Sequence, residues 1–352
     1  MAEAQQGSGI SIRNLYKIFG HNAAAYVDLV KQGMSKAELN QKHGHVLGLK
    51  DINIEMPGGD IFVIMGLSGS GKSTLIRHIN RLIDPTSGEV IVGGADVVKM
   101  NPRELQEFRR HKTAMVFQKF ALLPHRNVLE NAVYGLEIQG VPRARQVEEA
   151  MRWIERVGLK GFEKKYPNQL SGGMQQRVGL ARALTNDAPI LLMDEAFSAL
   201  DPLIRMDMQT VLLDLQKEIK KTIVFITHDL DEALRLGDRV AILRDGEVIQ
   251  QGTAQDIVLN PADGYIANFV KEVNRGRVIR VDSIMQPANG DTPPSPVRAS
   301  AEATLDEAAT LLATAGQQHL SIVDQSGAQI GTVDLQRIVS AMVTPAAGEA
   351  RA

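Results

Sequence analysis

Apolar runs that end abruptly in polar residues dominate the first part of this sequence. Residues 61–65 (IFVIM), 190–193 (ILLM) and 222–226 (TIVFI) are almost continuously apolar, as is typical of parallel strands buried on both faces. A glycine-rich segment, an Asp-Glu pair and a Thr-His pair follow these runs in turn. Open α/β sheets bind ligands at the carboxyl ends of their strands. The pattern therefore predicts an α/β fold with a site at one sheet edge.

Two further segments of this part show other periodicities. Residues 10–19 (ISIRNLYKIF) are typical of an opening strand, and residues 20–47 then interrupt the connection to the next strand. Within that insertion apolar residues recur at helical spacing, and Ser35–Glu38 forms a capping-box pattern that opens a helix. We expect a helical hairpin that either packs on the sheet or contacts a partner. Between Gln118 and Ser171 the pattern is helical again.

The composition changes after about residue 275, which divides the 352 residues into two domains. Residues 271–277 are polar, and residues 287–296 (PANGDTPPSP) are typical of a turn-rich loop. The pattern then predicts a helix, a strand, a second strand and a final helix, at residues 303–313, 320–324, 329–333 and 334–342.

The overall composition limits the classes of protein to which this chain can belong. An apolar fraction of 44%, a charged fraction of 23% and a net charge of −2 are ordinary for a soluble globular protein, and they disfavour nucleic acid as a partner. The absence of cysteine excludes disulfides and thiolate metal sites. We find no signal-peptide pattern and no apolar run long enough to span a membrane. Any work on a membrane would require a membrane-spanning partner.

The glycine-rich segment after the first buried run matches G-x-x-x-x-G-K-[ST], a loop that surrounds phosphates. Its backbone N–H groups and the N-terminus of the following helix provide an anion site. By itself the loop predicts only a nucleoside triphosphate. The candidate nucleotide ligands are Gly66, Ser68, Gly69, Ser70, Gly71, Lys72, Ser73 and Thr74.

A second motif makes the prediction more specific. The segments 170–177 (LSGGMQQR) and 193–201 (MDEAFSALD), together with the phosphate loop, resemble the motifs of ATP-binding-cassette (ABC) ATPases over about residues 10–270. The resemblance implies a P-loop NTPase fold, with a RecA-like core, an antiparallel β subdomain and a helical subdomain at about residues 119–178. We therefore expect an ABC ATPase domain at residues 1–275, with the helical insertion at 20–47.

The resemblance also implies ATP and Mg²⁺ as cofactors. Lys72 would hold the β/γ-phosphates and Ser73 would bind Mg²⁺, while Asp194 would orient the metal through its water shell. Gln118 resembles the Q-loop glutamine, whose amide joins that shell. Glu195 resembles the catalytic carboxylate that polarises the attacking water. His228 resembles the switch histidine that contacts the γ-phosphate; Lys72 and Gln118 complete the expected catalytic set.

In this family two subunits face each other head to tail. The resemblance implies that a second copy of the chain completes each site. The segment Ser198-Ala199-Leu200-Asp201 matches the D-loop that crosses the interface. The residues expected to contact the nucleotide of the opposite subunit are Ser171, Gly172, Gly173, Gln175 and Asp201.

An aromatic ring at the end of the first strand stacks on the adenine in related ATPases. Phe19 is the expected residue here, and Tyr16 is the alternative. Because the insertion begins directly after Phe19, the alignment leaves both open.

The last domain resembles a single cystathionine-β-synthase-type (CBS) repeat, a small α+β module that normally occurs as a tandem pair. We expect residues 276–352 to comprise a linker and this regulatory or dimerisation module. Residues 281–352 contain three basic and eight acidic side chains, so an anionic lipid surface should repel them. Our hypothesis is a dimerisation element that has lost salt sensing. A nucleotide-binding sensor remains the alternative.

Four parts of the chain resemble the glycine betaine/proline (quaternary amine) importer family. They are the sequences of residues 61–81 and 193–205, the insertion and the CBS-like tail. The resemblance implies uptake of glycine betaine, proline, choline or a similar solute. It also implies membrane permease subunits, a solute-binding protein and a peripheral location on the cytoplasmic side of the bacterial inner membrane. An importer for another solute, such as an amino acid or polyamine, and an ABC ATPase with no membrane partner remain open.

Overall fold

The computed structural model describes residues 8–118, 120–198, 200–288, 295–324 and 326–343. The chain divides into two compact units, each with its own sheet or sheets. The first unit comprises Met1–Asp229 and Leu236–Ile249, and the second comprises Leu230–Arg235 and Gln250–Ala352. Residues 250–275, which we assigned to the ATPase domain from the sequence, thus cluster with the second unit.

A sheet with a parallel core positions the candidate site. Its strand order is β10-β9-β3-β8-β7-β6, and β3 pairs in parallel with both β8 and β9, as β7 does with β6 and β8. The side chains of β3, β7 and β8 are buried on both faces, as the apolar runs predicted. The strands are β3 (Ile61–Met65), β6 (Thr113–Val116), β7 (Ile190–Asp194), β8 (Thr222–Thr227), β9 (Arg239–Arg244) and β10 (Glu247–Gly252).

An antiparallel sheet packs against this core, with the order β2-β1-β4-β5. Its strands are β1 (Ile10–Phe19), β2 (Val46–Met56), β4 (Ser87–Val92) and β5 (Ala95–Asp96). One buried cluster includes Leu49 of β2, Leu75 of α3 (Lys72–Ile79) and Ile226 of β8. The two sheets and the helix that follows the phosphate loop therefore share one hydrophobic core. The predicted α/β core with an antiparallel subdomain is confirmed.

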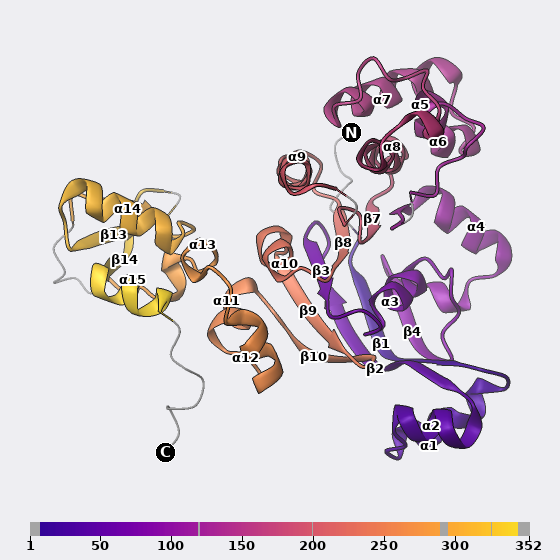
Figure 1. Cartoon of the computed structure of the whole chain (residues 1–352), viewed down its shortest axis with the longest axis horizontal. Coiled ribbons are helices and arrows are strands. Elements are labelled where there is room, and N and C mark those ends of the chain that lie inside the picture. Colours follow the sequence, from indigo (N-terminus) through magenta and orange to yellow (C-terminus); the bar gives the residue numbers. More distant parts are fainter. Residues whose placement is uncertain (1–7, 119, 199, 289–294, 325, 344–352) are drawn as a thin grey trace. The chain divides into compact units, whose positions relative to one another are not determined.

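A helical subdomain lies to one side of the sheets (Figure 1). It comprises α5 (Val128–Ala132), α6 (Tyr134–Ile138), α7 (Arg143–Arg156) and α8 (Gly172–Thr185). Trp153 and Ile154 of α7 are buried in it, in agreement with the helical pattern of the sequence. Helices α4 (Pro102–His111) and α9 (Pro202–Ile219) belong to the rest of the first unit.

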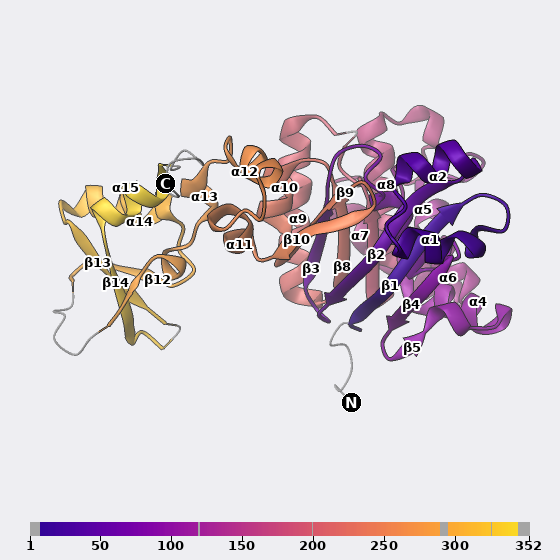
Figure 2. The same ribbon diagram turned by 90° about the horizontal axis from the view of Figure 1, so that it is seen from below.

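The insertion forms the expected helical hairpin and packs on the antiparallel sheet (Figure 2). A 3₁₀ turn at Ala23–Tyr26 leads into α1 (Val27–Lys31) and α2 (Lys36–His43). Ser35 caps α2 and makes the predicted capping box with Glu38. Val30 and Leu39 are fully buried against strand residues such as Ile18, so the hairpin has a small core of its own.

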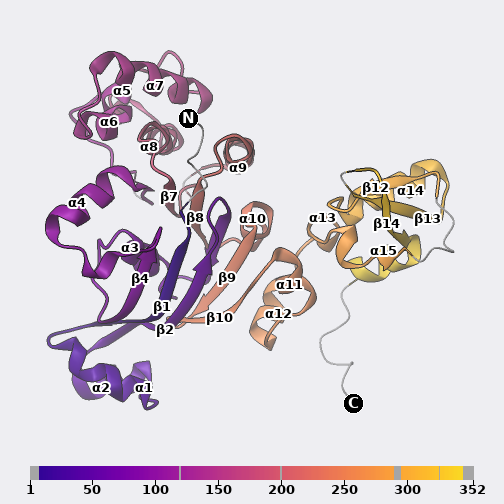
Figure 3. The same cartoon turned by 180° about the vertical axis from the view of Figure 1, so that it is seen from behind.

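The second unit contains a sheet with the order β11-β14-β13-β12, and α14 and α15 cover one face of it (Figures 2 and 3). Its later elements follow the predicted order of helix, strand, strand and helix. They are β11 (Gln286–Pro287), β12 (Arg298–Ser300), α14 (Leu305–Ala315), β13 (His319–Val323), β14 (Gln329–Asp334) and α15 (Leu335–Met342). Helices α10 (Leu230–Leu236), α11 (Ala254–Leu259), α12 (Gly264–Val270) and α13 (Arg275–Val278) precede them. Six residues of the predicted 287–296 loop, 289–294, lie outside the described residues.

Among the described residues, no helix combines the length and apolarity that crossing a membrane requires.

His78 of α3 makes the stability of the fold sensitive to acid. The ring is buried, its Nδ1 lies 2.7 Å from the Thr74 carbonyl oxygen, and burial lowers its pKa to about 4. The unfolded chain therefore takes up a proton near the ordinary pKa of about 6.5, whereas the folded chain does not. Between pH 7.5 and pH 5 this one group should lower the free energy of unfolding by about 2 kcal/mol.

Urea unfolding of wild type and His78→Gln at both pH values measures this contribution. The pH dependence should be smaller in the variant by that amount, and equal slopes would contradict the assignment. His111, whose imidazole is partly exposed on α4, provides the matched control as His111→Gln.

Candidate active site

The phosphate loop joins β3 to α3 in a shape that requires glycine. Gly66, Gly69 and Gly71 have positive φ angles of 155°, 80° and 103°. A Cβ at Gly66 would lie 2.3 Å from the Leu243 carbonyl oxygen, and one at Gly71 would lie 2.8 Å from the Gly48 carbonyl oxygen. The loop therefore passes against β9 and β2 at distances that exclude a side chain.

The groups of this loop fit a phosphate ligand. Lys72 is 4% exposed, and its Nζ donates to the carbonyl oxygens of Gly66 (2.7 Å) and Leu67 (3.0 Å). Burial lowers the pKa of Lys72, while the Glu195 and Asp194 carboxylates oppose that shift. Among the described residues, the buried Ser70 hydroxyl has no hydrogen-bond partner. A cation, an unpaired hydroxyl and the N-terminus of α3 thus gather at one loop, as an anion site requires.

Asp194, fully buried at the end of β7, connects the core sheet to α3. Its Oδ1 accepts a hydrogen bond from the Ser73 hydroxyl (2.7 Å), and its Oδ2 accepts one from Arg77 (3.1 Å). Hydroxyl and carboxylate oxygens are the ligands that Mg²⁺ prefers, so the pair Ser73 and Asp194 fits the metal predicted from the sequence. Arg77 lies outside the phosphate-loop motif and was not predicted from the sequence. The sequence feature that could have indicated its role is its position on α3, one helical turn after Ser73.

Three polar side chains meet at the ends of neighbouring strands. Gln118 follows β6, Glu195 follows β7 and His228 follows β8. The Gln118 amide donates to Glu195 Oε2 (2.7 Å), and His228 Nδ1 lies 3.7 Å from Glu195 Oε1. Glu195 adopts a left-handed φ of 47°, and its backbone N–H donates to the Ile226 carbonyl of β8. Parallel pairing thus brings together three residues that are far apart in the chain. A carboxylate held in this way can accept a proton from a bound water.

The LSGG segment begins α8. The described side-chain hydrogen bonds of Ser171 and Gln175 are made with residues 167–174. The Ser171 hydroxyl caps the helix by accepting from the Met174 N–H (3.3 Å). The Gln175 amide donates to the carbonyls of Pro167 and Leu170. Gly172 and Gly173 form the first turn, and the Gly172 backbone is exposed.

Asp201 caps α9, where its carboxylate accepts from the Ile204 N–H (3.1 Å). Ser198 donates its hydroxyl to the Glu195 carbonyl (2.9 Å), which links this segment to the carboxylate cluster. Ala199, predicted as part of the same D-loop, lies outside the described residues. Ser68 and Thr74 lie in the phosphate loop and the first turn of α3, as the motif predicts.

The two aromatic candidates for base stacking have different surroundings. Tyr16 is 5% exposed and belongs to the small core of the insertion. Phe19 is 40% exposed, and Lys17 Nζ lies 5.0 Å from its ring centroid. The Phe19 ring packs against Gly48, whose carbonyl faces Gly71 of the phosphate loop. Phe19 is therefore the ring that is both accessible and connected to the phosphate site through β2.

Comparisons with known proteins agree with this geometry. The profile of the ABC transporter family matches residues 49–198. The glycine betaine transport ATP-binding protein OpuAA of Bacillus subtilis (strain 168) is 53% identical over 279 residues, which cover 79% of this chain and 67% of the relative. The glycine betaine/proline betaine transport system ATP-binding protein ProV of Escherichia coli (strain K12) is 45% identical over 333 residues, 95% of this chain and 82% of the relative.

Two further similarities extend the comparison. The trimethylamine N-oxide transport system ATP-binding protein TmoW of Pelagibacter ubique (strain HTCC1062) is 43% identical over 330 residues, 94% of this chain and 96% of the relative. A dimeric ATP-binding cassette, solved in a post-hydrolysis state with ADP and Pi, is 33% identical with a TM-score of 0.61. That similarity covers 70% of this chain and 98% of the solved one.

The fold and the site define an ATP-hydrolysing cassette of the ABC type. The chain belongs to the family of ABC transporter ATP-binding proteins that includes the glycine betaine transport subunits.

Gly66→Ala should destabilise the protein much more than Gly69→Ala. Both glycines have a positive φ, but only at Gly66 would the added Cβ meet a carbonyl oxygen, because nothing lies within 4 Å of the Gly69 position. Left-handed strain alone costs about 1–2 kcal/mol, and the steric clash should add about 1–3 kcal/mol at Gly66. Thermal unfolding of both variants measures the difference. Equal losses would show that the loop can move away from β9.

Proposed function

We propose that this chain is the ATP-hydrolysing subunit of an importer for quaternary amines, such as glycine betaine. The contact between Gln118 and Glu195, with His228 on the other side of the carboxylate, is the observation that carries the ATPase assignment. The cargo rests on the relatives, which are named for transport of glycine betaine, proline betaine, carnitine and trimethylamine N-oxide.

The proposed binding mode starts from the phosphate loop. Lys72 would exchange its two loop carbonyl partners for β/γ-phosphate oxygens, and the Ser70 hydroxyl and loop N–H groups would donate to the same ligand. Ser73 and Asp194 would hold Mg²⁺, which neutralises the charge of the phosphates when bound. Phe19 would stack on the adenine. The exposed ring and its contact with Gly48 favour it over the buried Tyr16.

The proposed chemical step depends on the cluster at the sheet edge. Glu195 would accept the proton of the attacking water, and His228 would orient that water and contact the γ-phosphate. Gln118 is bonded to Glu195, so a displacement of the loop that follows Gln118 would alter the position of the carboxylate. That connection would make hydrolysis sensitive to the partner bound to the loop.

A second copy of the chain would complete each site. The similar solved cassette is dimeric, and the exposed Ser171 and Gly172 at the start of α8 are available to a nucleotide held by another subunit. Asp201 and its neighbours would lie at the same interface. Gln175 would support that segment through its bonds to Pro167 and Leu170.

The import function requires a permease, and a groove in the first unit is the proposed contact. Its volume is about 190 Å³, and its lining comes from α4, β6, α6 and α8 and includes Arg110, Tyr134 and the exposed Ile138. Aromatic and arginine side chains are enriched in protein interfaces. The permease would place the chain at the cytoplasmic side of the bacterial inner membrane, and a separate solute-binding protein would capture the amine, in an aromatic cage suited to a cation.

We further propose that residues 276–352 are a linker and a single CBS-like module that pairs with its copy in the second subunit. The order of α14, β13, β14 and α15 supports this assignment. Among the described residues of 281–343, Arg298 and Arg337 are the basic ones, against six acidic ones. Asp291, Glu349 and Arg351, which we counted from the sequence, lie outside the described residues.

Glu195→Gln should abolish hydrolysis while preserving ATP binding. The amide keeps the size of the side chain but cannot accept the proton, so the hydrolysis rate should fall by about 10²–10⁴-fold. ATP-bound dimers should accumulate, and cells that carry the variant should lose uptake of labelled glycine betaine. Glu218→Gln is the matched control, because Glu218 lies on α9 and pairs with Arg156. Hydrolysis at the wild-type rate would overturn the assignment of Glu195 as the proton acceptor. If the wild-type protein supported uptake of a different solute alone, the proposed quaternary-amine cargo would be wrong.

Truncation after Val278 should preserve ATP-dependent uptake and leave its salt dependence unchanged. The acidic module should not bind an anionic leaflet, so its removal should not affect a salt response. Uptake measured across a series of salt concentrations tests this, with truncation after Met342 as the control. If salt activation is present in the full chain and disappears on truncation at Val278, the module is a salt sensor.

A further inference from the structure

The loop after Gln118 contains two consecutive residues in the left-handed conformation. Phe120 and Ala121 have φ angles of 39° and 48°. Residues other than glycine rarely adopt this conformation, and they keep it only where the surrounding structure holds them. The contacts that hold this turn therefore identify the parts of the molecule that depend on it.

Arg182 of α8 holds the turn from one side. Its Nη1 donates to the Ala121 carbonyl (2.6 Å) and its Nη2 donates to the Phe120 carbonyl (3.2 Å). One planar guanidinium thus binds two successive carbonyls, the arrangement for which its rigid fork is suited. Burial lowers the pKa of this guanidinium, and bonds to a charged donor are stronger in such surroundings.

The same turn lies along the face of α8 that begins at the LSGG segment. A Cβ at Gly172 would lie 3.6 Å from the Phe120 ring, and one at Gly179 would lie 3.6 Å from the Phe120 carbonyl oxygen. Positions 172 and 179 are seven residues apart, about two helical turns, so they share a face. The loop therefore follows α8 from the first turn of the helix to Arg182.

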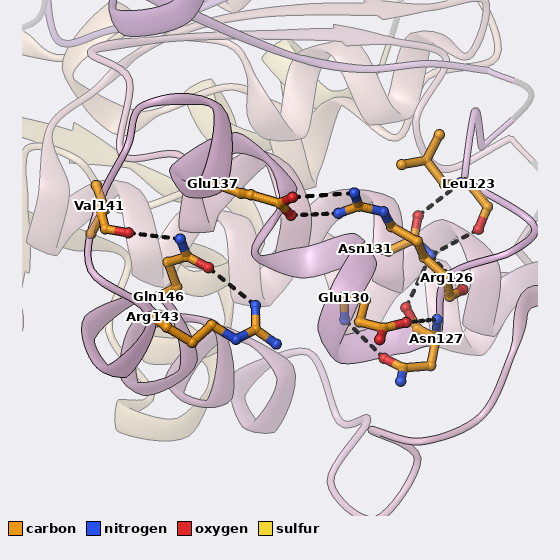
Figure 4. Close-up of polar contacts among 9 residues, drawn as sticks. All are labelled: Leu123, Arg126, Asn127, Glu130, Asn131, Glu137, Val141, Arg143 and Gln146. Carbon is orange, nitrogen blue, oxygen red and sulfur yellow. Dashed lines mark hydrogen bonds and ion pairs between the residues drawn. The ribbon is translucent and has the colours of Figure 1, made fainter.

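A second side chain fastens the loop to the helical subdomain. The fully buried Asn131 of α5 accepts from the Leu123 N–H (2.8 Å) and donates to the carbonyls of Leu123, Arg126 and Asn127. Figure 4 shows the Asn131 amide among these backbone groups, with the Arg126 guanidinium paired to Glu137 beside it. The loop is thus bonded to α5 as well as to α8.

At its other end the loop begins at Gln118, whose amide is bonded to Glu195. Contacts at Gln118 and at the Phe120–Ala121 turn, on either side of residue 119, which lies outside the described residues, therefore connect the carboxylate at the core sheet to α8. We propose that Arg182 is a positioning residue, which locks the Phe120–Ala121 turn to α8 and thereby sets the LSGG segment relative to Gln118 and Glu195. This inference rests on the proposed function, in which those two parts meet across the dimer.

Arg177 of α8 provides a matched comparison. Its Nη1 donates to the carbonyls of Val157 and Gly158, both at 3.3 Å, at the end of α7. It therefore ties α8 to the end of α7 through two carbonyls, whereas Arg182 binds two carbonyls of the loop after Gln118. No described hydrogen bond of Arg177 reaches that loop. A purely structural role predicts similar consequences for the loss of either arginine.

The experiment measures ATP hydrolysis by the full-length chain with Arg182→Ala, Arg182→Lys and Arg177→Ala. For Arg182→Ala we expect kcat to fall by about tenfold or more, because small misplacements of reacting groups are costly. KM for ATP should stay within about twofold, since the phosphate loop is untouched. Arg182→Lys should restore part of the rate, and Arg177→Ala should lower the melting temperature without a comparable loss of kcat.

ATP-dependent dimer formation in a Glu195→Gln background separates this inference from the proposed function. Glu195→Gln alone should form dimers with ATP, and adding Arg182→Ala should reduce the dimer fraction about tenfold at the same ATP concentration. If Glu195→Gln still hydrolyses ATP, the proposed function fails. If Glu195→Gln forms dimers and the added Arg182→Ala changes nothing, the positioning role of Arg182 fails.

Two substitutions at Ala121, to glycine and to valine, test the proposal even if Arg182→Ala does not fold. Ala121→Gly should preserve kcat, because glycine adopts a positive φ readily, whereas Ala121→Val should reproduce the low kcat at unchanged KM. Equal kcat in the two Ala121 variants, or equal losses in Arg182→Ala and Arg177→Ala, would overturn the proposal.

Discussion

The buried carboxylate of Asp194 is the constraint on which the rest of the site depends. It lies at the end of β7 with no exposed surface, and a buried charge is tolerated only when it is paired and hydrogen-bonded. Ser73 and Arg77 of α3 satisfy its two oxygens. The helix that follows the phosphate loop is therefore held against the strand that precedes Glu195. In this geometry the phosphate loop and the carboxylate of Glu195 can face the same bound ligand.

Two kinds of contact hold the loops around Asp194. The phosphate loop is fixed by close backbone contacts at Gly66 and Gly71, which leave no space for a side chain. The loop after Gln118 is held instead by side chains, chiefly Arg182 and Asn131, in a conformation that isolated residues avoid. Close backbone contacts suit a phosphate loop that keeps one conformation. Side-chain hydrogen bonds suit a loop whose displacement would move the helical subdomain relative to the core sheet.

Much of the fold followed from local patterns. Continuous apolar runs predicted β3, β7 and β8 because strands buried on both faces consist almost entirely of apolar residues. Ser35 and Glu38 predicted the start of α2 because the capping box is a contact between residues three apart. The roles of Arg77, Arg182 and Asn131 were not predictable in this way. The partners of Arg77 and Arg182 lie in distant segments, and those of Asn131 lie in the irregular chain just before its own helix and at the cap of that helix. Arginine and asparagine at such positions are usually solvated on a helix surface.

The sequence by itself determined which chemical groups the chain presents: the phosphate loop, the LSGG segment, the acidic pair Asp194-Glu195 and His228 at strand ends. These signals are local, since each depends on residues adjacent in the chain. Only the tertiary structure decided which groups meet. Parallel pairing of β6, β7 and β8 brought Gln118 and His228 to Glu195. The core of the insertion buried Tyr16 and left Phe19 exposed. Both outcomes depend on packing between segments that are distant in the chain, which no local pattern records.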